Sequence, residues 1–264
     1  MKKTVLLSLF ILLSTTILFA QQENDRLYIL MEFMSVSDEM NGDYQEVEEF
    51  WSKIHQQRIA DNNIIGWDLW AMSPNGTAQG SQYFTVTLFN SLAGMLEGIP
   101  GDKFQEYVQN AYPNMSQSDR DAMMEKTVKS RDIAHQVYTV EINNTSGDFD
   151  MPIGTMIVFD IMKQQNENYE KVEDEIFKPW HQQMVDNGQK GAWGLMRILL
   201  PSGSEAVGSH ITYSMYKDYK QVANHWEGDG SGEMDLATQL AVQKGLKTRD
   251  MRGVEMARLV MKVR

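Results

Sequence analysis

Short apolar runs and amphipathic segments follow one another along this chain in an order that occurs twice. A run of strand length is followed by a segment with apolar residues at helical spacing, two strand-length runs joined by a proline-containing turn, further helical segments and a final strand-length run. The first copy comprises residues 27–35, 44–62, 65–73, 83–90, 91–95, 104–112, 121–129 and 135–142. The second comprises residues 155–163, 169–187, 192–200, 210–217, 219–226, 234–246 and 254–263. Each copy has the order strand, helix, strand, strand, helix, strand, which predicts a split βαβ unit with helices on one face of an antiparallel sheet.

Sequence matches at a nearly constant spacing indicate that the two copies arose by duplication. His55–Gln57 recurs as His181–Gln183, and Trp67 recurs as Trp193, in both cases 126 positions later. Further matched pairs, at spacings between 118 and 127, are Tyr44 with Tyr169, Val47 with Val172, Asp61-Asn62 with Asp186-Asn187, Gly66 with Gly191, Thr85 with Thr212 and Lys129-Ser130-Arg131-Asp132 with Lys247-Thr248-Arg249-Asp250. A duplication of this kind defines the architecture before single elements are assigned.

The two copies are predicted to be ferredoxin-like repeats in tandem. The first spans residues 26–143 and the second 153–264, with a linker over 144–152 that is rich in turn-forming residues. We predict an α+β fold in which the two antiparallel sheets pack face to face as an intramolecular α+β barrel, because each sheet must cover the face that its helices leave open. Pro179 lies inside the first helical segment of the second repeat and predicts a kink or a new turn there.

Residues 1–20 have the pattern of a secretory signal peptide. Lys2 and Lys3 precede an apolar run that ends at Phe19, and Ala20 supplies a small residue at the predicted cleavage point. The alternative is an uncleaved anchor, but the run is shorter than the roughly 20 residues that a spanning helix needs. We therefore expect a secreted or periplasmic protein with no membrane span after cleavage.

The composition restricts the available chemistry. The chain has 36 acidic and 24 basic residues, and its formal net charge of -12 disfavours a nucleic-acid partner because polyanion binding needs a clustered basic surface. Cysteine is absent, which excludes disulfides, thiolate nucleophiles and cysteine-ligated metal centres. The sequence contains no metal-binding, phosphate-loop or nucleotide-binding motif. Any function therefore depends on histidine, carboxylate and tryptophan side chains.

Several of these repeated features resemble the dimeric α+β-barrel superfamily, in the region of the NIPSNAP-like and antibiotic-biosynthesis-monooxygenase-like families. They are the aromatic-rich helix that ends in His55–Gln57 or His181–Gln183, the Gly66 and Trp67 that open the next strand, and the hairpin. The resemblance covers the chain after the signal segment at the level of architecture and implies a fold with a pocket. Members include cofactor-free monooxygenases, haem-degrading enzymes, haem peroxidase relatives and proteins without known activity, so the resemblance allows haem and no motif requires it.

His55 and His181 are the first candidates for chemistry, because a histidine near neutral pKa can act as a base, an acid or a ligand. Both lie late in the first helix of their repeat. His55 has Trp51 one turn before it and Ile59 one turn after it, so it lies on or beside the apolar stripe. The alternative is a structural histidine that stabilises the last helical turn.

Glu32 and Asp160 are the second pair of candidates, since each lies in the middle of the first strand of its repeat. A carboxylate among apolar strand residues is costly unless it is paired. The final strand lies beside the first in this fold, so an ion pair is expected with one of the basic residues that precede it, which are Lys129, Arg131, Lys247 and Arg249. A buried ion pair and a pocket carboxylate with a shifted pKa both fit this pattern. Glu48, in contrast, belongs to an acidic helical run, and we assign that run and its counterpart in the second repeat to the solvent-facing side.

The hairpin strands alternate between polar and apolar residues. Phe84, Val86 and Leu88, with Ile211, Tyr213 and Met215, form the apolar set, which we expect beneath the helices. The polar set is expected to face the space between the sheets or solvent, where with Trp67 and Trp193 it lines a small-molecule site. Its candidate ligand-binding members are Tyr83, Thr85, His210 and Thr212. The alternative for both tryptophans is a place in the core.

These observations favour an exported protein that binds a small apolar or aromatic molecule in a pocket of one or both repeats. Oxidation is the activity that the resemblance implies, with His55 or His181 as base or haem ligand. The competing hypothesis is a non-catalytic protein whose barrel is simply packed and whose surface contacts a partner. The sequence does not define further oligomerisation.

Overall fold

The computed structural model describes residues 26–76, 78–228 and 235–264. The predicted signal segment, 1–20, and Met234, the predicted start of a helix, lie outside these ranges. None of the helices in the described ranges is long and apolar enough to cross a bilayer.

Each repeat forms its strands and helices in the predicted order. The elements of the first repeat are β1 (Tyr28–Ser35), η1 (Asp38–Met40), α2 (Asn41–Ala60), β2 (Gly66–Met72), β3 (Tyr83–Phe89), α3 (Leu92–Glu97), α4 (Phe104–Ala111), α5 (Gln117–Ser130) and β4 (Asp132–Asn144). Those of the second are β5 (Met156–Gln164), α6 (Tyr169–Val172), η2 (Glu173–Phe177), α7 (Lys178–Asp186), β6 (Ala192–Leu200), β7 (His210–Tyr216), α8 (Tyr219–Glu227), α9 (Leu236–Leu246) and β8 (Arg249–Val263). Periodicity and turn residues thus identified the elements of both copies.

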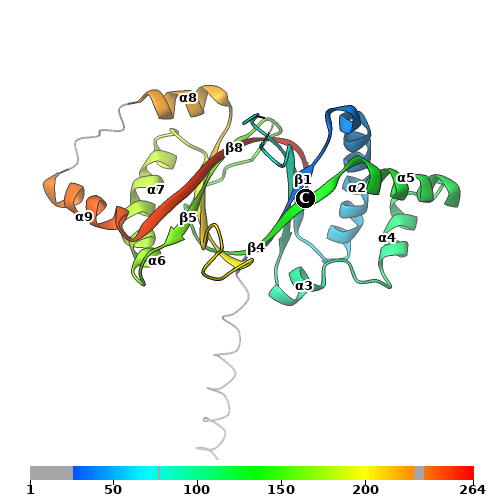
Figure 1. Cartoon of the computed structure of the whole chain (residues 1–264), viewed down its shortest axis with the longest axis horizontal. Coiled ribbons are helices and arrows are strands. Elements are labelled where there is room, and N and C mark those ends of the chain that lie inside the picture. Colours follow the sequence, from blue (N-terminus) through cyan, green and yellow to red (C-terminus); the bar gives the residue numbers. More distant parts are fainter. Residues whose placement is uncertain (1–25, 77, 229–234) are drawn as a thin grey trace, which may run out of the picture.

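The strands close into one antiparallel barrel in the order β1-β3-β2-β8-β5-β7-β6-β4. Figure 1 shows the barrel between two groups of helices, with α2, α4 and α5 on one flank and α6, α7, α8 and α9 on the other. The seams between the repeats are the pairs β2–β8 and β4–β6. The predicted intramolecular α+β barrel is confirmed.

The last strand of each repeat is longer than predicted. β4 and β8 begin at Asp132 and Arg249, where they already pair with the ends of β1 and β5. Further along, the same two strands pair with β6 and β2 of the other repeat. One long strand therefore both completes its own sheet and closes the barrel.

A π-helix explains the drift in the repeat spacing. Glu48 and Glu173 are 125 positions apart, whereas His55 and His181 are 126 apart, and η2 is a π-helical turn that accommodates one extra residue between them. Pro179 follows this turn at the start of α7, as its missing donor predicts. From the turn to Trp67 and Trp193 the spacing is 126: Asn62 has φ 57° and its equivalent, Gly188, has φ 70°. The Asp61-Asn62 match to Asp186-Asn187 was therefore wrong by one residue.

The predicted sidedness of the hairpin strands was also wrong. The apolar set, exemplified by Phe84 and Ile211, packs inside the barrel against residues of the opposite sheet such as Ile29 and Phe159. The polar set faces outward, under the helices. Because the barrel brings two sheets together, its interior takes the more apolar face, and the helices cover the other.

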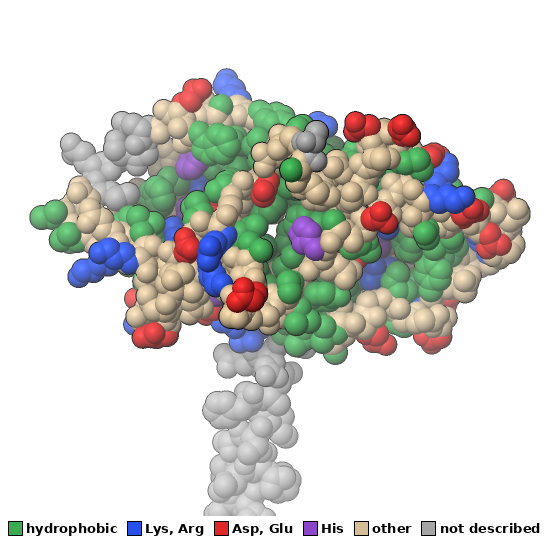
Figure 2. All heavy atoms as spheres, in the orientation of Figure 1, with side chains coloured by type: hydrophobic (Ala, Val, Ile, Leu, Met, Phe, Trp, Pro, Cys, Tyr) green, Lys and Arg blue, Asp and Glu red, His purple; other side chains and the backbone are tan. Residues whose placement is uncertain are grey.

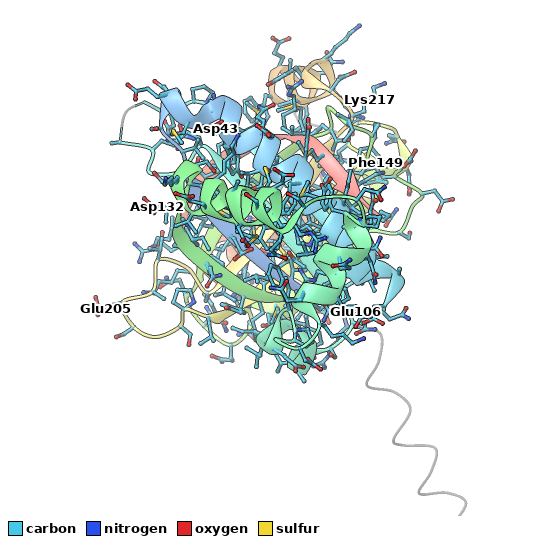
Figure 3. All side chains as sticks on the ribbon, turned by 90° about the vertical axis from the view of Figure 1, so that its right-hand side faces the viewer. Asp43, Glu106, Asp132, Phe149, Glu205 and Lys217 are labelled. Atoms are coloured by element: carbon cyan, nitrogen blue, oxygen red, sulfur yellow. The ribbon has the colours of Figure 1, made fainter. Side chains whose placement is uncertain are left out.

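The exterior agrees with the acidic composition. On the face drawn in Figure 2, acidic side chains are spread over both flanks and do not form one patch. Viewed from the side of the first repeat, α2 and α5 lie in front of the strands, and Asp132 marks where β4 begins beside them (Figure 3). The space between these helices and the sheet contains the candidate site.

Candidate functional site

A cavity of about 350 Å³ lies in the first repeat, between α2 and the outward face of the sheet. This is within the roughly 300–1,000 Å³ range of small-molecule sites. Residues from two helices, four strands and the segment after α3 line it, among them Leu30, Glu32, Glu48, Trp51, His55, Arg58, Trp67, Thr85, Thr87, Phe89, Met95, Ile99, Arg131, Gln136 and Tyr138. Five of the predicted site residues, Glu32, His55, Trp67, Thr85 and Arg131, are thus brought to one cavity.

His55 is a neutral ring in the C-terminal part of α2. It stacks on Trp67, with 4.8 Å between ring centroids, and its Nδ1 lies 3.2 Å from Nη1 of Arg58. Since a guanidinium only donates, Nδ1 accepts and the proton of the neutral ring is on Nε2. Burial, followed by the charge of Arg58, lowers the pKa of His55 well below its usual value. No described residue accepts a hydrogen bond from Nε2, so this N–H is free for a ligand.

Glu48 is a buried carboxylate that the sequence analysis placed wrongly on the solvent side. It is 1% exposed and forms an ion pair with Arg131. Burial raises the pKa of Glu48 to about 7, against the opposing effect of Arg131. A carboxylate with a pKa near neutral, in the wall of a cavity, is suited to accept a proton.

Glu32 is oriented by neutral donors. Nε2 of Gln136 donates to it at 2.7 Å, and Oγ1 of Thr85 donates at 3.4 Å. The predicted ion pair between Glu32 and Arg131 was wrong, because the arginine pairs with Glu48 on the helix. β4 does lie beside β1 as predicted, and Gln136 is the residue opposite Glu32.

The second repeat contains the same core arrangement with other partners. His181 stacks on Trp193 at 4.8 Å, and Nζ of Lys190 lies 3.0 Å from its Nδ1. Burial, then the charge of Lys190, lowers the pKa of His181 to about 2, and burial lowers the pKa of Lys190 to about 8. Lys190 also donates to Ser214 Oγ at 3.1 Å.

The carboxylates of the second repeat follow the same rearrangement as those of the first. Asp160 accepts from Oγ1 of Thr212 at 3.0 Å, and burial raises its pKa. Arg249 pairs with the fully buried Glu173, so its predicted pairing with Asp160 was wrong too.

Two predicted ligand-binding residues, Tyr83 and His210, have their polar atoms occupied by other protein groups. Tyr83 packs beside Tyr44 and donates its hydroxyl to Oδ1 of Asn41 at 2.7 Å. His210 has both ring nitrogens occupied, by Ser209 at 2.9 Å and Glu170 at 2.9 Å. Both side chains therefore stabilise local structure.

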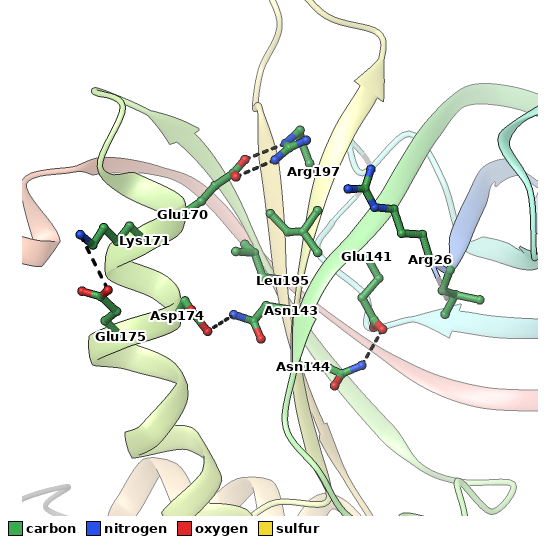
Figure 4. Close-up of a pocket in the computed structure, with 12 residues that line it drawn as sticks. Arg26, Glu141, Asn143, Asn144, Glu170, Lys171, Asp174, Glu175, Leu195 and Arg197 are labelled. Atoms are coloured by element: carbon green, nitrogen blue, oxygen red, sulfur yellow. Dashed lines mark hydrogen bonds and ion pairs between the residues drawn. The ribbon is translucent and has the colours of Figure 1, made fainter. Parts of the chain in front are cut away.

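A wider, open groove of about 700 Å³ crosses the β4–β6 seam (Figure 4). Its charged and polar groups mostly satisfy one another. Glu170 receives two hydrogen bonds from Arg197, both at 2.6 Å, and Asn143 donates to Asp174 at 2.6 Å. None of the predicted site residues lines it, and we do not assign it a ligand.

Glu48, Arg58 and Lys190 were not predicted from the sequence, although they lie beside predicted site residues. A signal existed for Glu48, because it follows Tyr44 by one helical turn and both recur 125 positions later. Arg58 lies in phase with the buried stripe of α2. Lys190 gives no signal in the sequence. It takes the place of Arg58 beside the histidine, but it comes from a different position of the repeat.

The two repeated histidines do not fit the axial position of a haem. Iron needs a ring nitrogen with a free lone pair, but Nδ1 of His55 and His181 each accepts from a cation and Nε2 carries the proton. The described ranges also contain no group of three His, Asp or Glu residues arranged for a metal ion.

No family model and no curated protein sequence matches the chain. Solved structures do share its fold. A proposed monooxygenase of Fusobacterium nucleatum subsp. nucleatum aligns with a TM-score of 0.56 and 10% identity over 90% of this chain and 93% of its own. An anthrone oxidase-like protein aligns with a TM-score of 0.50 and 12% identity over 91% and 94%. A haem-binding protein of Thermus thermophilus aligns with a TM-score of 0.50 and 8% identity over 90% and 94%.

These similarities define the class of fold. The solved structures share this α+β barrel over about nine tenths of each chain, so the match includes both halves of the barrel. At such low identity they show the fold alone, and the site must be interpreted from its own residues.

Proposed function

We propose that the first-repeat cavity binds a small aromatic molecule that has a phenolic O–H or a C–H made acidic by conjugation to a carbonyl group. The residues of the cavity remove this proton as the first step of oxidation by dioxygen. The observation that carries this proposal is the combination, in one cavity, of the free N–H of His55 and the carboxylate of Glu48. The walls suit the aromatic body of such a ligand, because Trp51, Trp67 and Phe89 line them.

The two polar groups supply complementary roles. Glu48, in its ionised form, accepts the proton of the ligand, and its pKa of about 7 matches neutral conditions. The electron pair left behind moves onto the ligand oxygen, where the Nε2–H of His55 donates a hydrogen bond to the developing anion. Glu32, oriented by Gln136 and Thr85, is a second acceptor for a ligand hydroxyl.

Anthrone is a suitable probe, since one of the structural neighbours is described as anthrone oxidase-like. In the reaction, anthrone and one dioxygen give anthraquinone and one water. The carbon between the rings loses two hydrogens and gains one oxygen atom, and the other oxygen atom leaves as water. This chemistry needs no haem, in agreement with the unsuitable histidines.

The assay compares the wild-type chain with two variants, Leu30→Phe and Leu88→Phe, which enlarge a leucine on opposite faces of the sheet. Leu30 lines the cavity, whereas Leu88 faces the barrel interior. We expect wild type and Leu88→Phe to bind anthrone and to accelerate anthraquinone formation in air. Leu30→Phe should lose both, while circular dichroism shows that each variant is folded.

Two outcomes would contradict the proposal. Absence of anthrone binding and turnover in the wild type would favour the packed, non-catalytic barrel. Equal loss in both variants would show that the effect is not specific to the cavity.

Export is a separate part of the proposal, supported by the charge and apolar pattern of residues 1–20. N-terminal sequencing of the protein recovered from the periplasm or medium tests it. A mature chain that begins just after Ala20 is the expected result, and an intact Met1 on protein retained in the cytoplasm would refute it.

A further inference from the structure

The barrel interior contains a second cavity, of about 130 Å³, on the opposite face of the strands from the first. Its walls come from both repeats, with Met31 of β1, Leu88 of β3, Ile157 of β5 and Met215 of β7 among them. Strand residues alternate in direction, so neighbours such as Leu30 and Met31 line different cavities.

The polar groups at the rim of this cavity are already paired. The carboxylate of Asp68 receives two hydrogen bonds from Arg264, at 2.8 and 2.9 Å. The hydroxyl of Tyr213 donates to Glu141 at 2.5 Å. Of the residues that line the cavity, Trp70 alone has a buried polar side-chain atom without a partner, its indole Nε1.

Water is a poor occupant of such a space. A buried water needs two to four polar partners, and apolar cavities of about 150 Å³ stay dry and take up benzene or xenon. Four of the wall residues, Met31, Met151, Met196 and Met215, carry polarisable thioethers that make favourable contacts with aromatic rings.

We infer that the barrel interior is a binding site for a small apolar molecule of about the size of benzene, independent of the outer cavity. The ligand requires no charged group, because the charged groups at the rim are already paired. The proposed function and this inference can fail separately, since different residues carry them.

Methyl-labelled methionine provides a direct test with benzene as the probe. Each methionine methyl gives one NMR signal, assigned by Met→Leu variants, and benzene shifts the signals of nearby methyls through its ring current. We expect saturable shifts for the four wall methionines, and any shift of Met95, which lines the outer cavity, should saturate independently of them. Shifts confined to Met95, or no saturable shift at all, would overturn the inference.

A pair of variants locates the site independently. Leu88→Phe fills the inner cavity and should weaken benzene binding at least tenfold, while Leu30→Phe obstructs the outer one and should not. The reverse pattern, or equal weakening by both, would refute an inner site. If Leu88→Phe fails to fold, the methionine shifts of the wild type still decide the question.

Discussion

The two repeats keep the same buried framework but differ in the side chains that surround it. Both contain a tyrosine, a glutamate and an arginine in equivalent places, Tyr44, Glu48 and Arg131 in the first repeat and Tyr169, Glu173 and Arg249 in the second. Both also stack a neutral histidine on a tryptophan. We attribute the retention of this framework in both repeats to the requirements of the fold, and we look for what allows the first repeat to use its Glu48 and His55, which line a cavity.

The source of the cation beside the histidine is one difference. In the first repeat Arg58 approaches Nδ1 from α2 itself. In the second repeat Met184 occupies that helical position, and Lys190 reaches the ring from the segment before β6. The same electrostatic arrangement was therefore kept while the residue that provides it changed, so the histidine is held neutral with an accepting Nδ1 in both repeats.

The wall between helix and sheet is the other difference. Trp51 of the first repeat lines the cavity and donates its N–H to Thr127 at 3.2 Å. The equivalent Phe177 packs over Arg249, 4.3 Å from its guanidinium. There Gly245 replaces Thr127, and a Cβ at this position would lie 2.8 Å from Val172. The second repeat is therefore closely packed where the first repeat has Trp51 lining its cavity.

The largest expected effect is on turnover, and it should separate the two glutamates. Glu48→Gln removes the proton acceptor, so we expect anthrone oxidation to fall by a factor on the order of 10²–10⁴, whereas Glu173→Gln should leave it within about twofold. In the wild type the rate should rise with pH through about 7, because only the ionised Glu48 accepts a proton. Similar losses from both substitutions would contradict the assignment of activity to the first repeat.

The next effect concerns stability and should be larger in the second repeat. Arg249→Met leaves Glu173, which is 0% exposed, without its cation. We expect a loss of about 3–5 kcal/mol in the free energy of unfolding, measured with urea. Arg131→Met should cost less, because Glu48 borders a cavity that water can enter.

A double variant distinguishes a lost ion pair from general damage. Replacing Glu173 with leucine in the Arg249→Met background removes the unpaired charge and should recover much of the stability. Failure to recover would show that the arginine matters mainly through its packing on Phe177.

How much of this was predictable depends on what each pattern reports. The duplication and the apolar periodicity identified the strands and the barrel, because both are repeated along the sequence. The same alternation did not define sidedness, since Phe84 and Thr85 are both buried, one in the barrel and the other under α2. A strand covered on both faces has no solvent side to identify.

The candidate site was only partly predictable for a similar reason. His55 and Glu32 stand out as polar residues in apolar segments, and the structure places both at the cavity. Glu48 has acidic neighbours, Glu46 and Glu49, which are exposed, so composition alone assigns all three to solvent. Its ion pair with Arg131 joins residues 83 positions apart, which no local pattern reports.

A smaller effect, on the pH dependence of the free energy of unfolding, should distinguish Lys190 from Arg58. Burial lowers the pKa of Lys190 to about 8, so the folded chain releases this proton at a lower pH than the unfolded chain does. Stability from this group therefore rises between pH 8 and the ordinary lysine value near 10.5, by up to about 3 kcal/mol, and is lost again as pH falls from 10.5 to 8. Urea unfolding at pH 8 and 9.5 should show part of this rise in the wild type relative to Lys190→Met.

Arg58 supplies the matched comparison for Lys190. Burial lowers the pKa of Arg58 to about 10, so its contribution changes only above that pH. Arg58→Met should therefore preserve the stability difference between pH 8 and 9.5. A difference that disappears in Arg58→Met and persists in Lys190→Met would show that the rise has another origin.

The smallest effect tests the wall that distinguishes the repeats. The hydrogen bond from Trp51 to Thr127 should contribute about 1 kcal/mol to stability. A double-mutant cycle of Trp51→Phe and Thr127→Val measures this coupling free from the separate costs of losing the indole and the hydroxyl. Phenylalanine is the residue that the second repeat has at this position, so Trp51→Phe also gives this part of the first wall the identity of the second. If the wall rather than the buried framework sets the function, Trp51→Phe should weaken anthrone binding while unfolding stays cooperative. Unchanged binding would leave the cation beside the histidine, Arg58 in the first repeat and Lys190 in the second, as the difference between the repeats.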